Sequence, residues 1–135
     1  MAISLDQAES VLGAARKTAV ELGETVSLAV VEVGGNLVAF ARMDGAAVHT
    51  ADIAKRKADT AIALGFDTVH MSAAAPRGQS LFGGPPQSGS HALVPNGGGV
   101  IIRVGGTVIG ALGVSGADSS ITDHRIGTAA VAQLD

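Results

Sequence analysis

The sequence has 135 residues, which is the size of a single domain with a core of its own. It contains three Phe and neither Trp nor Tyr, so the core must be aliphatic and rich in alanine. The formal net charge of -3 and the scarcity of aromatic side chains argue against nucleic-acid binding. Cysteine is absent, which excludes disulfide bonds, thiolate metal sites and a cysteine nucleophile. No signal-peptide pattern and no apolar run of membrane-spanning length occur, so we expect a cytoplasmic protein that does not enter a membrane.

The first predicted element is a helix over residues 4–22. Ser4 and Gln7 have the spacing of a capping box, in which two residues satisfy each other's backbone N–H groups at a helix start. Apolar residues then recur at helical spacing, and Gly23 is a residue type that ends helices.

Two pairs of β-rich runs share one pattern. Strands predicted over 25–33 and 36–43 flank Gly34–Gly35, a pair typical of a tight hairpin turn. The segment 100–112, VIIRVGGTVIGAL, flanks Gly105–Gly106 in the same way. A phosphate-binding glycine loop lies between a strand and a helix, so this second glycine pair is interpreted as a turn between two strands.

A second helix is predicted over 48–64, ending at Gly65. Its apolar positions recur on one face, and Lys57 falls on that face because it lies four residues after Ile53. A short helical turn is predicted over 68–73.

A glycine- and proline-rich stretch without periodicity follows for over twenty residues, and a loop of this length is usually functional or disordered. A short strand is predicted near 91–94, and a capped helix over 118–133. The element order predicts an α/β (α+β) domain whose sheet is mainly antiparallel, with helices covering at least one face.

Several of these segments together resemble one family. They are AVVEVGGNLVAFARMDGA, a helix with IAKRKADTA, a Gly/Pro-rich loop, and GGGVIIRVGGTVIGALGVSG. In this order they are similar to the GlcG/HbpS (DUF336) family of haem-binding-like proteins, which also includes the C-terminal domain of some PduO-type corrinoid adenosyltransferases. The resemblance covers nearly the whole chain. It is quite specific to the fold and much less specific to a function.

The resemblance implies a profilin-like domain with an antiparallel five-stranded sheet and flanking helices. It also implies a homo-oligomer, in which dimers assemble further, often to octamers. Some members bind haem, so haem is the cofactor that the resemblance suggests, and no other cofactor is implied.

Three basic residues are candidates for ligand contacts. Two interpretations of Lys57 stay open. In one it contacts an anion or serves as an amine base in a pocket; in the other its aliphatic chain covers alanines while its ammonium group reaches water or a neighbouring subunit. His49 lies two helical turns away on the same face, which favours a joint pocket. Arg42 either holds a carboxylate such as a haem propionate, or makes a salt bridge that belongs to the fold, and we favour the salt bridge.

The remaining candidates lie in or beside the long loop. His91 is the best candidate for a haem axial ligand or a general acid/base. Phe82 lies beside two glycines and is a candidate lid over an apolar ligand. The backbone N–H groups of Gly97, Gly98 and Gly99 can approach a ligand closely, although a simple turn is the alternative. Ser115 either offers its hydroxyl to a ligand, beside N–H groups of the helix from 118 that suit an anion, or belongs to a turn and helix cap, and we favour the turn and cap.

Three functions remain open on the sequence alone. The first is binding of haem, another tetrapyrrole or a corrinoid near a subunit interface, with Arg42 and Lys57 on the propionates and His91 near the metal. The second is a cofactor-independent enzyme of a catabolic pathway that acts on a small carboxylate or carbonyl metabolite, with Lys57 or His91 moving protons. The third is an assembly module that has no chemistry of its own.

Overall fold

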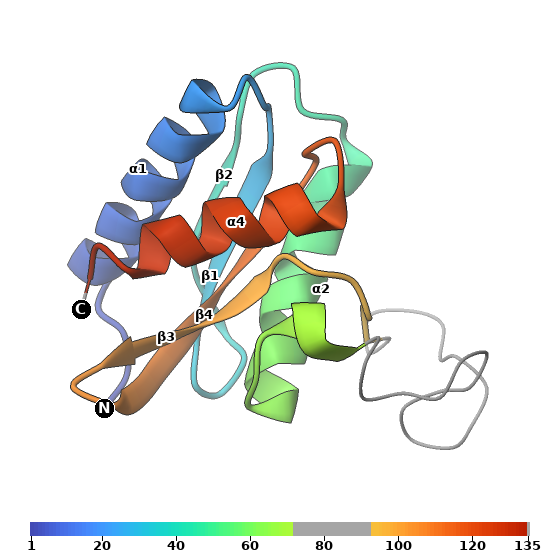
Figure 1. The fold of residues 1–135 in the computed structure, drawn as a ribbon. Helices are drawn as coiled ribbons and strands as arrows, with labels where there is room; N and C mark the ends of the chain where they lie inside the picture. Colours follow the sequence, from blue (N-terminus) through green and yellow to red (C-terminus); the bar gives the residue numbers. More distant parts are fainter. Residues whose placement is uncertain (72–92, 135) are drawn as a thin grey trace.

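A computed structural model describes residues 1–71 and 93–134, and its centre is one antiparallel sheet with helices on both faces (Figure 1). The strand order is β2-β1-β4-β3. Along the chain the elements are α1 (Leu5–Glu21), β1 (Ser27–Glu32), β2 (Leu37–Arg42), α2 (His49–Leu64), the short 3-10 helix η1 (Thr68–His70), β3 (Gly99–Val104), β4 (Thr107–Ser115) and α4 (Ser120–Val131). Helices α1 and α4 lie on one face of the sheet and α2 lies on the other.

The first helix has the predicted bounds to within one residue at each end. The Ser4 hydroxyl accepts a hydrogen bond from the backbone N–H of Gln7 at 3.1 Å, and the Gln7 side chain accepts one from the backbone N–H of Ser4 at 2.9 Å. The capping box is therefore complete. Gly23 follows the helix with a φ of 73°, in the left-handed region that favours glycine.

The two predicted hairpins are both present, but their turns differ. In the β3–β4 turn Gly105 and Gly106 have φ of 57° and 81°, and positive φ at both central residues is the type I′ arrangement. The β1–β2 turn holds three residues, 33–35, because the N–H of Glu32 still pairs with the carbonyl of Asn36 at 3.0 Å. Only Gly35 has positive φ there, so the predicted two-residue turn is wrong at the first hairpin.

The described residues form four strands, where the family resemblance implied five. The short strand predicted near 91–94 is not formed at Leu93 and Val94. Instead of pairing with a strand, the N–H of Val94 donates to the hydroxyl of Thr60 in α2 at 3.1 Å. The rest of that predicted strand lies outside the described residues, as do residues 72 and 73 of the predicted helical turn.

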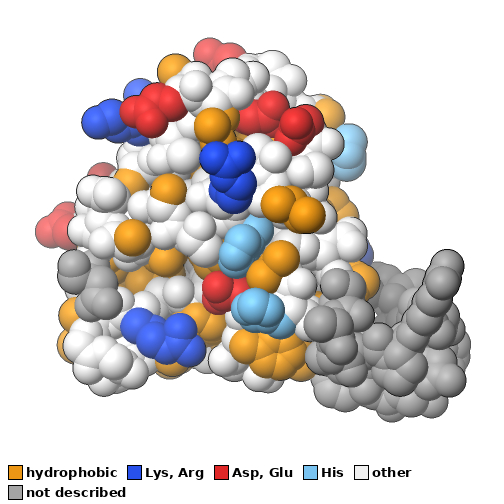
Figure 2. All heavy atoms as spheres, viewed as in Figure 1, with side chains coloured by type: hydrophobic (Ala, Val, Ile, Leu, Met, Phe, Trp, Pro, Cys, Tyr) orange, Lys and Arg blue, Asp and Glu red, His pale blue; other side chains and the backbone are white. Residues whose placement is uncertain are grey.

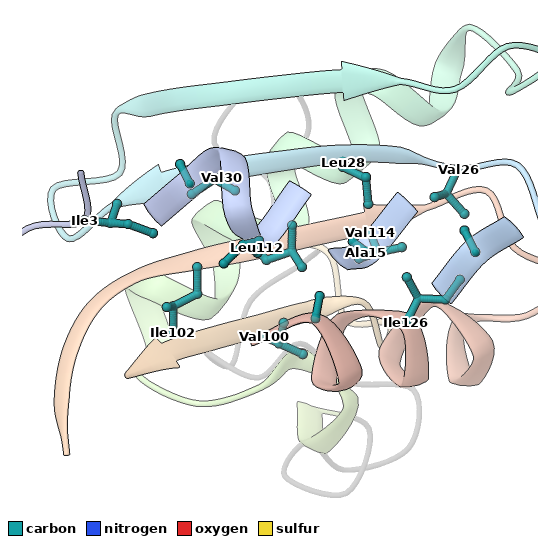
Figure 3. Packing of buried hydrophobic residues seen from close by; sticks show 14 of the residues in the cluster. Ile3, Ala15, Val26, Leu28, Val30, Val100, Ile102, Leu112, Val114 and Ile126 are labelled. Carbon is teal, nitrogen blue, oxygen red and sulfur yellow. The ribbon is translucent and has the colours of Figure 1, made fainter. Parts of the chain in front are cut away.

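The main core lies between the sheet and the pair α1 and α4 (Figure 3). Its largest fully buried side chains come from all these elements and include Leu28, Ile102, Ile109, Leu112 and Ile126. A smaller cluster lies under α2, where Val31, Ile101 and Ala111 meet two alanines of the helix. The core is aliphatic, as the composition predicts.

Helix α2 packs unusually close to the sheet. A Cβ atom added at Gly113 in β4 would overlap the carbonyl oxygen of Ala54, so no side chain fits between helix and strand at this point. This contact holds the middle of α2 against β4 and fixes where the helix places Lys57, one turn further along.

The two edges of the sheet differ. The edge strand β3 is covered by the segment around η1, because Asp67 accepts a hydrogen bond from the N–H of Ile101 and Thr68 accepts one from the N–H of Gly99, both at 2.9 Å. The edge strand β2 keeps two large apolar side chains in solvent, with Leu37 51% and Phe40 42% exposed. Among the residues that the structure describes, one edge of the sheet is therefore covered and no segment pairs with the other.

Candidate functional site

A buried ion pair connects helix α2 on one face of the sheet with helix α4 on the other. The ammonium of Lys57 lies 2.9 Å from Oδ2 of Asp123 in α4 and donates to the carbonyl of Val114 in β4 at 3.0 Å. The second carboxylate oxygen of Asp123 accepts a hydrogen bond from the N–H of Ala117 at 2.9 Å. Because both charges are paired and hydrogen-bonded, burial of this lysine is tolerated on the apolar face of α2.

The glycine triplet before β3 gives this lysine its room. A Cβ atom at Gly98 would lie 2.8 Å from the Lys57 ammonium and closer still to the Val114 carbonyl oxygen. The Gly98 carbonyl accepts the N–H of Val114 at 2.8 Å, and the N–H of Gly99 is taken by Thr68. Gly99 therefore has no N–H group to offer a ligand, and only Gly97 and Gly98 remain of the predicted amide cradle.

A pocket of about 380 Å³ opens beside the ion pair. Its walls come from the start of α2, the end of β4, the start of α4 and the segment before β3. The lining residues are His49, Thr50, Ile53, Lys57, Val94, Asn96, Ser115, Gly116, Ala117, Ser119, Ser120 and Asp123. The predicted joint pocket of His49 and Lys57 is thus present, with Lys57 in its floor and the exposed His49 at its rim.

The start of α4 forms the wall opposite α2. The Ser119 hydroxyl caps this helix by accepting the N–H of Thr122 at 3.1 Å. The sequence placed the cap near Ser115, which instead is the last residue of β4 and is 6% exposed. Ser115 lines the pocket, and its hydroxyl makes no hydrogen bond within residues 1–71 and 93–134.

The other predicted contact residues do not join this pocket. Arg42 is exposed at the end of β2, and its guanidinium donates only to the Ala46 carbonyl, at 3.5 Å, among the partners that the described chain offers. The salt bridge favoured for Arg42 on the sequence is not formed within that part of the chain. Phe82 and His91 lie outside the described residues.

The remaining histidines are spread over the surface. Figure 2 shows histidine side chains beside the start of α2 and again over α4 and η1, with charges of both signs scattered between them. His70 is exposed, and Nδ1 of His124 is buried without a hydrogen-bond partner among the described residues. No three or more His, Asp or Glu side chains of residues 1–71 and 93–134 are arranged to hold a metal ion.

Comparison with known proteins identifies the family. The family model described as "Haem degrading protein HbpS-like" matches residues 3–132. The chain belongs to the HbpS-like family. An uncharacterised 15.0 kDa protein from the dhaT-dhaS intergenic region of Citrobacter freundii is 38% identical to it over 114 residues, which cover 84% of this chain and 80% of that protein.

Two solved structures of similar proteins share the fold of this HbpS-like chain. The protein ORFY of Klebsiella pneumoniae is 33% identical with a TM-score of 0.87, covering 98% of this chain and 90% of that one. The PduOC:haem complex is 28% identical with a TM-score of 0.84, covering 98% of this chain and 94% of that one. The resemblance predicted from the sequence is therefore confirmed. Separately, none of the described helices is long and apolar enough to cross a membrane.

Sequence reasoning missed one residue of the site in this HbpS-like chain and misassigned the local structure of another. Asp123 was not recognised as the partner of Lys57, although an acid in the first turn of the last helix is visible in the sequence. Ser115 belongs to a strand and not to the turn that the sequence suggests. The available sequence signal is that Ser115 directly follows an apolar run typical of a strand, which it can extend. In the structure it pairs with the buried Ser27 of β1, so both side chains lie on the same face of the sheet.

Proposed function

We propose that this chain binds haem, or a related tetrapyrrole or corrinoid, at the pocket between α2, β4 and α4. The proposal is supported by the family, described as haem degrading, and by the similarity to a protein solved as a haem complex. We assign the ligand to this particular pocket because of the position of Val94. This residue lines the pocket and follows His91, the predicted axial ligand, by three positions in the sequence.

The described lining is compatible with one edge of such a ligand. Its volume lies in the range of about 300–1,000 Å³ that is usual for small-molecule sites. Ile53 and Val94 supply apolar contacts, and His49 supplies an imidazole at the rim. When bound, haem would bring a redox-active iron, and in this proposal the residues of the chain hold and orient the group.

Lys57 has a different part in this proposal than the sequence suggested. Its ammonium is already held by Asp123 and by the Val114 carbonyl, so it supports the pocket floor and is a poor partner for a haem propionate. The same two contacts disfavour Lys57 as a proton-transferring base, which weakens the enzyme alternative. Pairing of Lys57 with an acid is compatible with the assembly-module alternative, but the pocket beside this pair favours ligand binding.

The proposal includes assembly of copies of this chain into a homo-oligomer. It is supported by the open edge strand β2, where Leu37 and Phe40 stay exposed on a strand with no outer neighbour among the described residues. A second copy is the occupant that the family resemblance favours. Light scattering of the purified protein, with and without haem, measures the mass.

A haem titration followed by absorbance tests the ligand. We expect a saturable Soret band with a defined ratio of haem to chain. His91→Ala should weaken or shift this band, because it removes the proposed iron ligand. His70→Ala is the matched control, since His70 is exposed in η1 and is not among the pocket residues. Absence of a specific band in the unaltered protein would reject haem, and an unchanged band in His91→Ala would reject His91 as its ligand.

A further inference from the structure

The pocket is lined by a mostly buried serine whose hydroxyl has no partner in the described part of the chain. Ser115 is 6% exposed and lines the pocket, and the neighbouring polar groups are already engaged elsewhere. Thr50 donates its hydroxyl proton to the Ala47 carbonyl at 2.6 Å, so Ser27 must donate its own proton to Thr50 at 2.9 Å. Neither of these two hydroxyls bonds to Ser115, which lines the pocket.

A hydroxyl that lines a pocket without a protein partner is free to bond a water or a ligand there. Ser115 can therefore donate to an acceptor oxygen of a bound molecule.

The start of α4 offers further donors at the same wall. Just before the helix, the N–H of Ala117 donates to Asp123 and the N–H of Asp118 donates to Glu24. In its first turn, the N–H of Thr122 donates to the Ser119 hydroxyl. Within the described residues, the N–H group of Ser120, which lines the pocket, is left without an acceptor. The positive end of a helix of 12 residues favours an anion at this place.

The charges of the pocket permit an anion despite the acid in its floor. Among the described lining residues Asp123 is the single acid, and its two oxygens are occupied by the Lys57 ammonium and the Ala117 N–H. The pair carries no net charge, and the exposed His49 stands at the rim. The free groups of the described lining include the Ser115 hydroxyl and the Ser120 N–H, both of which can donate.

We propose that this end of the pocket is a carboxylate-binding subsite, in which the Ser115 hydroxyl and the N–H of Ser120 donate to the ligand. The carboxylate belongs either to a small organic acid or to a propionate of haem, and both present the same acceptor oxygens. The proposal uses the pocket of the proposed function but does not require haem to bind.

Amide NMR spectra of the full chain, titrated with propionate or succinate at constant ionic strength, test the subsite directly. We expect saturable shifts centred on the amides of residues 115–121, and no comparable shifts with the uncharged propionamide. Ser115→Ala should weaken binding at least about tenfold, because it removes a hydrogen bond to a charged group. Ser10→Ala, at an exposed position of α1, is the matched control and should leave affinity unchanged.

Two further titrations identify the source of the carboxylate. If it is a propionate, Ser115→Ala weakens binding of haem but not of haem dimethyl ester, and small acids compete with haem. If it is a free acid, succinate binds while the haem titration is unaffected by Ser115→Ala. Either result supports the subsite. The proposal is overturned if neither acid shifts these amides and haem binding ignores Ser115→Ala, and this outcome leaves the haem proposal standing.

Discussion

Lys57 and Asp123 form an ion pair with an N–O distance of 2.9 Å, although 66 residues separate them in the sequence. Only 3% of Lys57 and 4% of Asp123 is exposed. The pair connects α2 on one face of the sheet with α4 on the other, and it forms the floor of the pocket. Its contribution to stability can be measured by removing each partner alone and both together.

Lys57→Met should lower the free energy of unfolding by about 3–5 kcal/mol, because it leaves the Asp123 carboxylate buried without a cation. The double variant Lys57→Met with Asp123→Leu should recover most of this loss, since no uncompensated charge remains. Urea denaturation of the four proteins in this cycle gives the coupling energy.

Lys55→Met is the control for the loss of a lysine from the same helix. Lys55 pairs with Asp59 at a third-exposed position, so its removal should change the unfolding free energy by less than about 1 kcal/mol. A double variant as unstable as the sum of its single changes would contradict a coupled pair.

Gly113→Ala should destabilise the protein strongly or prevent α2 from docking, because the new methyl group would overlap the backbone of Ala54. Gly13→Ala is the opposite case. Gly13 lies in the exposed interior of α1 with open space around it, so alanine should stabilise the helix by about 1 kcal/mol. Thermal melts of both variants compare the two glycines, and equal melting temperatures would show that α2 is not packed this closely.

Thr60→Val should lower the free energy of unfolding by about 1–3 kcal/mol, because it removes the acceptor of the buried N–H of Val94. It should also weaken ligand binding, since Val94 is part of the pocket wall. Thr60→Ser retains the hydroxyl and is the control for the hydrogen bond. If the valine variant were as stable as the serine variant, the bond would contribute nothing measurable.

Most of the fold was predictable because its signals are local. The capping box at Ser4 and the glycine pair at Gly105–Gly106 each require a particular backbone conformation within a few residues. The first hairpin was harder, since a glycine pair does not reveal whether the turn has two residues or three. The absent strand at Val94 was not predictable, because a hydroxyl of α2 takes the N–H group that a strand would have used.

The site was predictable only in part, for a related reason. Helical spacing placed Lys57 on a buried face, and its distance from His49 along the helix placed both in one pocket. Periodicity reports burial but does not say which distant acid approaches, so Asp123 was missed. The sequence left the triplet at Gly97–Gly99 open between ligand contacts and a simple turn, and it did not reveal that the backbone there passes close to Lys57.

The order of synthesis gives the ion pair a further consequence. When the ribosome has released residues up to Ser115, all four described strands and α2 are available, but Asp123 has not yet appeared. Docking α2 on the sheet at that moment would bury Lys57 without its counter-charge, at a cost of several kcal/mol. A nascent chain that ends before α4 should therefore dock α2 on the sheet less firmly. The ion pair makes this contact depend on the described helix that is synthesised last.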